Sequence, residues 1–344
     1  MMIHIFERIA LVTAGGLVSG LVAIAVMNPP EKTTTAPKAD LNMLTQAHAS
    51  GGSSEGTQKA QRFLPIKARG SEVLAGINVR SLETHSPVSE NSAENLDKSF
   101  SAMGYDLDQV RRGDTEVPRV FLASMPEDLD QVRQVPRKKA LFFKALLPLV
   151  LQMNAEITND RRRLWELQSQ LKKGIKPSAA NRLWLIVMAE RYKVKRGNIS
   201  ELIKRVDIIP VSLALAQAAE ESGWGTSRFA REGNAMFGQW TTTGKGLVPE
   251  KRDDGKTHKV QAFESLLHSA RSYARNLNTH RAYRELRTLR QELRRQGEQI
   301  QGMRLAEKLT AYSERGEEYV AALRALIVVN KLRYFDDARL NTDA

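Results

Sequence analysis

The sequence predicts a mainly α-helical protein that carries one small β-hairpin lobe. Apolar residues recur at helical spacing from residue 140 to about residue 332, with proline where helices would begin and glycine where they would end. Only residues 239–263 depart from this pattern. There, two short segments flank an Asp-Gly pair, which is a strong signal for a hairpin turn.

The first helices of the domain are predicted from apolar stripes and helix breakers. Residues 140–153 are apolar on most sides, and Pro148 is expected to kink them. Pro177 stands where a later helix would begin. The stripe of the helix between them consists of Leu164, Leu167 and Leu171.

Residues 210–223 are predicted to form a further helix, opened by Pro210 and closed by Gly223. Two strands are expected at 246–252 and 256–263, and helices resume near Ser265. Residues 317–332 are apolar enough to form a core helix.

The N-terminal third of the chain has a different composition. Residues 9–27 contain no charge and match the length that spans a bilayer, so residues 1–27 are predicted to be a signal anchor or a cleaved signal peptide, and the length favours an anchor. Residues 28–100, rich in Thr, Ser, Gly and Pro, are predicted to be a flexible, disordered linker. Residues 101–139 form a partly extended lead-in, and 140–344 the folded domain. We therefore expect the rest of the chain to be exported, with residues 9–27 as its membrane anchor.

The net charge of +13 resides entirely in residues 101–344, because the preceding residues contain equal numbers of basic and acidic side chains. Such an excess favours an anionic partner: a nucleic acid, a membrane face or an acidic polymer such as a cell wall. No nucleic-acid motif accompanies the arginines of residues 284–295, and export argues against such a partner. We expect no nucleic-acid binding.

Several kinds of chemistry find no support in the sequence. The absence of cysteine excludes disulfides, thiol nucleophiles and thiolate metal sites. The spacing of His258, His268 and His280 matches no common metal-ligand pattern, and no glycine-rich phosphate loop occurs. We expect neither a metal nor a cofactor, and we expect a monomer.

The stretch AQAAEESGWG, residues 216–225, places two acids at the end of an apolar helix. The negative end of the helix dipole disfavours a carboxylate there, so the pKa of such an acid is expected to rise. Glu221 shares a helix face with Ala214 and Gln217 and is the candidate for a half-buried position, whereas Glu220 is expected to face solvent. A carboxyl group that stays protonated near neutral pH can act as a general acid in glycoside hydrolysis, and Trp224 is expected beside it. The ordinary interpretation of such a sequence is a solvated last helical turn.

This stretch, followed by GNAMFG at residues 233–238, resembles the signature AQAALESGWG…GNLFG of the bacterial glucosaminidase-domain peptidoglycan hydrolases, glycoside hydrolase family 73. The resemblance covers about residues 117–336. It implies a lysozyme-like helical fold. Glu220 stands where the family usually has an apolar residue, which favours Glu221 as the acid.

The resemblance also implies the other residues of the site. A second catalytic acid on the hairpin aligns with Glu250, with Asp253 and Asp254 as rivals, and Tyr283 matches a tyrosine near the cleft. Aromatic rings also pack well on sugars. The candidate substrate-binding residues are Trp224, Asn234, Phe237, Gly238, Trp240 and Tyr273.

The function implied is that of an endo-β-N-acetylglucosaminidase, which cleaves the β-1,4 bond after N-acetylglucosamine in peptidoglycan glycan strands by general acid catalysis. Glu250 would activate water in an inverting reaction or assist from a flexible hairpin, and a shorter separation of the two carboxyl groups would make it a nucleophile. Substrate assistance by the N-acetyl group, which needs no protein nucleophile, is a further route. The sequence leaves these routes open. It also leaves open a muramidase or lytic transglycosylase of lysozyme-like fold, or a catalytically inactive cell-wall-binding protein.

Overall fold

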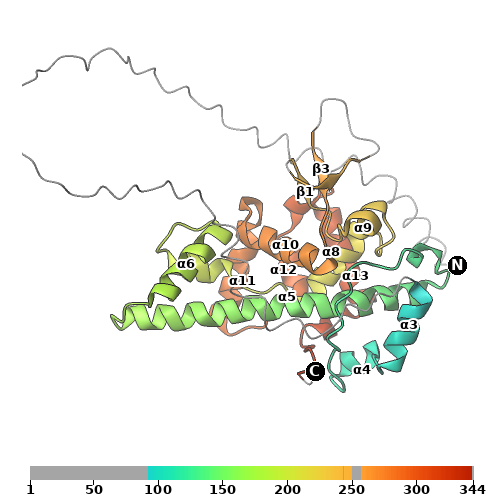
Figure 1. Cartoon of the computed structure of the whole chain (residues 1–344), viewed down its shortest axis with the longest axis horizontal. Helices are drawn as coiled ribbons and strands as arrows, with labels where there is room; N and C mark the ends of the chain where they lie inside the picture. Colours follow the sequence, from blue (N-terminus) through green and yellow to red (C-terminus); the bar gives the residue numbers. More distant parts are fainter. Residues whose placement is uncertain (1–91, 243, 250–256, 343–344) are drawn as a thin grey trace, which may run out of the picture. The chain divides into compact units, whose positions relative to one another are not determined.

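A computed structural model describes residues 92–242, 244–249 and 257–342, and within them the protein is mainly helical, as predicted (Figure 1). The predicted signal segment and most of the predicted linker lie outside the described residues. The α-helices are α3 (Ala93–Ala102), α4 (Leu107–Arg112), α5 (Val135–Lys172), α6 (Ala179–Arg191), α7 (Ile199–Arg205), α8 (Val211–Ser222), α9 (Arg228–Gly233), α10 (Leu266–Thr279), α11 (Arg284–Gln296), α12 (Gly302–Ala306) and α13 (Glu317–Val329). Short 3-10 turns are η1 (Leu129–Gln131), η2 (Arg281–Tyr283), η3 (Thr310–Tyr312) and η4 (Leu332–Phe335).

Helix α5 is a single helix of 38 residues, where the sequence analysis expected two helices and a kink. Pro148 lies inside it and is buried. The flanking residues Leu147 and Leu149 are also buried, so packing on both sides holds the helix together across the proline. By length and composition α5 could cross a membrane, but 72% of its most apolar window is buried in the protein, as in a soluble core helix.

The predicted linker extends too far, because its last residues form helix α3. Ser92 caps this helix by accepting a hydrogen bond from the Asn95 amide, and Leu96 and Phe100 are completely buried in the core. The lead-in is likewise part of the domain. Val117 forms a parallel bridge with Leu340, which ties this segment to the far end of the chain.

Helix α8 lies at the centre of the domain, in contact with α5, α12, α13 and η4. Its residues from Val211 to Ala219 are all buried, because the helix carries small or aliphatic side chains, mainly alanine and leucine, on every face. Pro210 precedes it and Gly223 closes it, as predicted. Asp336, the residue after η4, binds the first turn of α8: the Ser212 amide donates to Asp336 Oδ1 at 2.8 Å and the Ser212 hydroxyl to Oδ2 at 2.7 Å.

The β lobe is a three-stranded antiparallel sheet in the order β1 (Trp240–Thr241), β3 (Lys259–Gln261), β2 (Gly246–Leu247). Pairing of Leu247 with Val260 confirms the predicted hairpin pairing. The strands are shorter than expected, and strand β1 was not predicted. The Asp-Gly turn lies outside the described residues.

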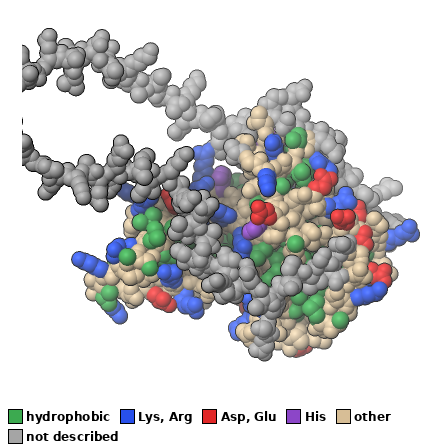
Figure 2. Space-filling model, in the orientation of Figure 1, with side chains coloured by type: hydrophobic (Ala, Val, Ile, Leu, Met, Phe, Trp, Pro, Cys, Tyr) green, Lys and Arg blue, Asp and Glu red, His purple; other side chains and the backbone are tan. Residues whose placement is uncertain are grey.

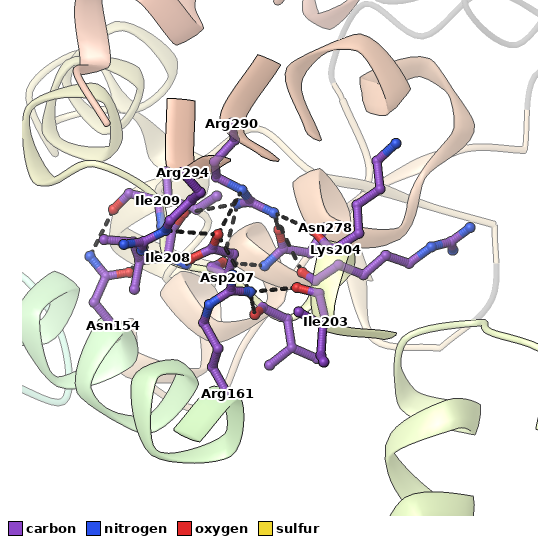
Figure 3. Close-up of polar contacts among 12 residues, drawn as sticks. Asn154, Arg161, Ile203, Lys204, Asp207, Ile208, Ile209, Asn278, Arg290 and Arg294 are labelled. Carbon is purple, nitrogen blue, oxygen red and sulfur yellow. Dashed lines mark hydrogen bonds and ion pairs between the residues drawn. The ribbon is translucent and has the colours of Figure 1, made fainter. Parts of the chain in front are cut away.

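Asp207, in the loop before α8, is the centre of a buried ion cluster (Figure 3). Its carboxylate lies 2.9 Å from Arg294 Nη2, 3.5 Å from Arg161 Nη1 and 3.8 Å from Arg290 Nε. Burial favours protonation of Asp207, but Arg290, Arg294 and Arg161 outweigh it and hold the pKa of the carboxyl below its ordinary value.

Arg290, which is completely buried, also fixes the backbone of this loop. Its guanidinium donates to the carbonyls of Asp207 and Ile208 and, at 2.7 Å, to Asn278 Oδ1. Asn154 of α5 binds both the amide and the carbonyl of Ile209. The chain entering α8 is therefore held by side chains from α5, α10 and α11 (Figure 3).

We expect Asp207→Ala to lower the free energy of unfolding by about 3–5 kcal/mol, since it leaves Arg290 as a buried charge without its carboxylate partner. Asp114→Ala is the matched control. It removes a carboxylate from the ion pair with Arg112, in which both side chains are more than half exposed, and is expected to cost less than about 1 kcal/mol. Denaturant unfolding of both variants measures the difference, and equal losses would contradict the role given to the cluster.

Candidate active site

The last turn of α8 leads into three successive residues with left-handed backbone: Gly223, Trp224 and Gly225, with φ of 57°, 61° and 78°. This conformation strains a tryptophan, so neighbouring contacts must hold it. The Trp224 ring makes edge contacts with Phe142 and Phe143 at centroid distances of 5.6 and 5.4 Å.

The described ring contacts of Trp224 are all with α5, and they include Lys139 Nζ at 4.6 Å from the ring centroid. Trp224 therefore anchors the turn after Glu221 to the long helix. Its predicted contact with substrate stays a prediction.

Glu221 is half-buried at the end of α8, densely surrounded by protein but with a remaining opening to solvent. The Gly238 backbone closes one side. A Cβ built on Gly238 would lie 2.5 Å from Glu221 Oε2, and Gly238 has a φ of 59°, so any side chain there would displace the carboxyl group. The structure thus brings Gly238 and Glu221 together, and Gly238 acts by leaving room for the acid.

Four buried tyrosines gather around Glu221: Tyr273, Tyr283, Tyr312 and Tyr319. Burial raises the pKa of each phenol, and the nearby Glu221 charge raises it further in every case. All four therefore stay protonated and can donate hydrogen bonds around neutral pH.

A directed chain of hydrogen bonds ends at Glu221. The Tyr273 hydroxyl donates to Gln217 Oε1 at 2.7 Å, and Gln217 Nε2 donates to the Tyr319 hydroxyl at 3.0 Å. The Tyr319 oxygen is thus an acceptor from Gln217, which leaves its own proton for the hydrogen bond that it makes with Glu221. Buried Gln217 fixes the direction of the chain.

The pKa of Glu221 is raised from 4.5 to about 8. Burial is the main cause, and the adjacent charge of Glu220 adds to it, whereas the Tyr319 hydrogen bond and Arg315 act in the opposite direction. The sequence analysis predicted a raised pKa from the helix dipole. The rise is as predicted, but removal of solvent is its principal cause.

Glu220 does not simply face solvent, as the sequence predicted. Its Oε1 lies 2.5 Å from Arg315 Nη1, and its side chain is 19% exposed. Because Arg315 pairs directly with Glu220, Glu221 is left without a direct ion pair, although the charges of both neighbours still act on its pKa.

Two of the predicted substrate-binding rings are buried. Phe237 is 2% exposed and stacks on Tyr273, which has no exposed surface, at a centroid distance of 4.0 Å. Both therefore support the site from behind and do not form an open cleft wall. This burial corrects the position that the sequence analysis gave them.

The other candidates lie at the edges of the site. Asn234 adopts a left-handed backbone at the end of α9 and donates to the Phe263 carbonyl at 3.2 Å, which is a structural role. Trp240 on β1 is half-buried, and its ring lies 4.2 Å from that of His258. Burial and the nearby Glu221 charge raise the pKa of Tyr283, on η2, so the structure brings this predicted pair together.

Glu250, Asp253 and Asp254, the candidates for the second acid, lie outside the described residues. Within the described residues, no three His, Asp or Glu side chains gather closely enough to hold a metal ion. A cavity of about 730 Å³ lies beside Ser212, at the first turn of α8, and does not include Glu221.

The sequence analysis missed Tyr312, Tyr319 and Arg315. A signal existed for Tyr319, since it and Gln217 are polar groups within two apolar helices, and such buried groups require partners. Arg315 lies in the loop before α13, where periodicity gives no indication of its partner.

Comparison with known proteins places the chain in a family. The sequence profile of the glucosaminidase family, described as mannosyl-glycoprotein endo-beta-N-acetylglucosaminidase, matches residues 197–332, which include all of α8 and the β lobe. No solved structure matches the chain.

The chain belongs to the glucosaminidase-domain family, as the resemblance indicated. Within it, the chain is Bax-like: it is 36% identical over 215 residues to Protein bax of Escherichia coli (strain K12), an alignment that covers 61% of this chain and 75% of that protein. Membership indicates a glycosidase with a glycan substrate.

The raised pKa of Glu221 predicts that this acid destabilises the fold as the pH rises. The unfolded chain loses the proton above pH 4.5, whereas the folded protein keeps it until about pH 8. The contribution of Glu221 to the free energy of unfolding is therefore fully present below pH 4.5 and is lost as the pH rises to about 8. Glu221→Gln removes this penalty and is expected to stabilise the protein by on the order of 1–2 kcal/mol at pH 7, after allowance for partial exposure, but not at pH 4.

Denaturant unfolding at several pH values measures this effect. The control is Glu166→Gln, which neutralises an exposed carboxylate on α5 and shows whether the loss of any glutamate charge has the same effect. A Glu221→Gln difference that is constant from pH 4 to pH 8 would show that Glu221 ionises normally.

Proposed function

We propose that the protein is an endo-β-N-acetylglucosaminidase that hydrolyses the β-1,4 bond after N-acetylglucosamine in peptidoglycan, with Glu221 as the general acid. The single observation that carries the proposal is the Glu221 carboxyl, half-buried at the end of α8 with a pKa of about 8. At pH 7 such a group is protonated in about nine of ten molecules, so it can protonate the leaving oxygen of a glycosidic bond.

The groups around Glu221 stabilise the carboxylate that remains after the proton has been transferred. When Glu221 gives up its proton, the Tyr319 hydroxyl donates a hydrogen bond to the new carboxylate, and the nearby Arg315 charge favours it. Both groups hold these positions before the reaction, through Gln217 and Glu220 respectively, so little reorganisation is needed.

The second acid is proposed to be Glu250, with Asp253 and Asp254 as rivals. A carboxyl separation of about 6.5–9.5 Å would correspond to an inverting enzyme in which this residue activates water, and about 5–5.5 Å to a nucleophile. Substrate assistance by the N-acetyl group needs no protein nucleophile and fits Glu221 as the acid equally well.

The proposed site of action is the periplasm, with residues 9–27 as the anchor in the inner membrane. Support comes from the uncharged length of that segment and from the glycan substrate class that the family indicates.

We expect Glu221→Gln to reduce the release of reducing ends from purified peptidoglycan by about 100-fold or more, because the amide cannot donate the proton. Mass spectrometry of the products of the native protein tests the specificity. N-acetylglucosamine at the new reducing end is the expected result, whereas N-acetylmuramic acid would indicate a muramidase and a 1,6-anhydro sugar a lytic transglycosylase. Absence of any product from the native protein would favour a wall-binding protein.

The alkaline limb of kcat/KM tests the role of Tyr319. Activity should fall as the pH rises through the pKa of Glu221, about 8. Tyr319→Phe removes a hydrogen bond that lowers this pKa, so its alkaline limb should move to higher pH while the rate falls. Tyr312→Phe is the matched control, because that hydroxyl donates to the Phe237 carbonyl at 2.8 Å, and its limb should stay in place. A shift to lower pH in Tyr319→Phe would overturn the assignment.

A further inference from the structure

The C-terminal end of α5, from residue 161, forms a helical hairpin with α6 and the residues that follow it, residues 161–196, at one end of the domain (Figure 1). Arg163 joins its two arms, since Nη2 donates to Asn181 Oδ1 at 2.8 Å and the guanidinium lies 4.4 Å from the Trp184 ring centroid. Arg191 Nη1 of α6 lies 3.8 Å from Oδ2 of Asp160, the α5 residue just before the hairpin. Met188 and Ala189 are buried, so α6 has a defined inner face.

This basic hairpin holds most of the net charge of the protein. Residues 161–196 contain 11 Lys and Arg and 2 acidic residues, a net charge of +9, against +13 for the whole chain. Lys172, Lys173 and Lys176 cluster around the connection between the helices, and all three are exposed. The hairpin is therefore a concentrated cationic surface.

The same hairpin exposes large apolar side chains. Five of the eleven exposed large hydrophobic residues in the described part of the chain lie within it: Trp165, Leu171, Ile175, Leu183 and Ile186. Trp165, Ile175 and Leu183 each expose at least half of their surface. Figure 2 shows hydrophobic side chains gathered over α6 with Lys and Arg between them. Exposed apolar groups that gather in this way, unlike scattered ones, are typical of a surface that binds a partner.

We propose that the basic hairpin docks on the surface of an anionic phospholipid bilayer. Lysine and arginine complement the anionic headgroups, and leucine, isoleucine and tryptophan enter the boundary between headgroups and acyl chains. An anionic polysaccharide or a nucleic acid would use the charge but not the exposed aliphatic groups. A second copy would bring one +9 surface against another, which electrostatic repulsion opposes.

The test uses the full chain and vesicles of phosphatidylcholine, with or without phosphatidylglycerol, that carry brominated acyl chains. Bromine quenches only tryptophans that reach the acyl boundary. Residues 9–27 are uncharged, so any insertion of that segment affects both lipid types alike. The expected result is stronger quenching in anionic vesicles, reduced by salt and lost in Trp165→Phe, which removes the exposed hairpin tryptophan.

Two variants separate the charge from the apolar contact. Lys172→Glu, Lys173→Glu and Lys176→Glu together should weaken binding to the anionic vesicles by about tenfold or more. The matched control reverses three other exposed charges, Lys331→Glu, Arg333→Glu and Arg339→Glu, and should bind as the native protein does. Leu183→Ser with Ile186→Ser should also lose quenching, with the net charge unchanged.

Several results would overturn the proposal. These are equal quenching in neutral and anionic vesicles, loss of binding in the control triple variant, and full retention in the serine variant, which would indicate attraction to an anionic polymer alone. A doubled mass in light scattering that the serine variant abolishes would indicate a second copy. Hydrolysis of soluble glycan fragments should be unchanged in the hairpin variants, so this test is independent of the proposed catalytic function.

Discussion

The burial of helix α8 on every side is the constraint on which the rest of the structure depends. Small and aliphatic side chains let α5, α12, α13 and η4 pack against it, so residues 211–219 have no free face and only Glu220 and Glu221 in the last turn are partly open to solvent. An acid in its last turn cannot reach bulk water as a surface glutamate does. The same packing that stabilises the core therefore removes solvent from Glu221 and gives the carboxyl group its raised pKa.

A helix in this position has to be held at both ends, and the protein does so with charged groups. Asp336 binds the first turn of α8, and the Asp207 cluster fixes the loop before it. The cluster also changes how the basic residues of α11 are understood. The sequence analysis counted the arginines of this helix in the cationic excess that favours an anionic partner, but Arg287 and Arg290 are buried and bind backbone carbonyls. The cationic surface lies instead mainly on the basic hairpin.

The sequence predicted what depends on local periodicity and on a fixed motif. The boundaries of α8, the antiparallel hairpin and the position of Glu221 follow from Pro210, Gly223 and the Asp-Gly pair, whose conformational preferences act locally. The uninterrupted α5 was missed because its tolerance of Pro148 depends on tertiary packing. Helix α3 was missed because its stability comes from burying Phe100 against distant residues, in a segment of linker-like composition. Tyr319 and Arg315, about a hundred residues from Glu221 along the chain, become neighbours only when α13 packs on α8.

The contrast between Asp207 and Glu221 shows why two acids withdrawn from solvent have opposite pKa shifts. Both carboxyl groups are withdrawn from solvent, and burial raises the pKa of each. Around Asp207, three arginines reverse that effect, so it remains a carboxylate and serves as a structural charge. Around Glu221, the cation that influences its pKa, Arg315, is paired with Glu220, and the Tyr319 hydroxyl is the hydrogen-bond partner. Glu220 thus raises the pKa of Glu221 by its own charge and by occupying Arg315. Glu220 stands where the family usually has an apolar residue. Through its ion pair with Arg315 it favours the protonated form of Glu221, which the proposed general acid catalysis needs.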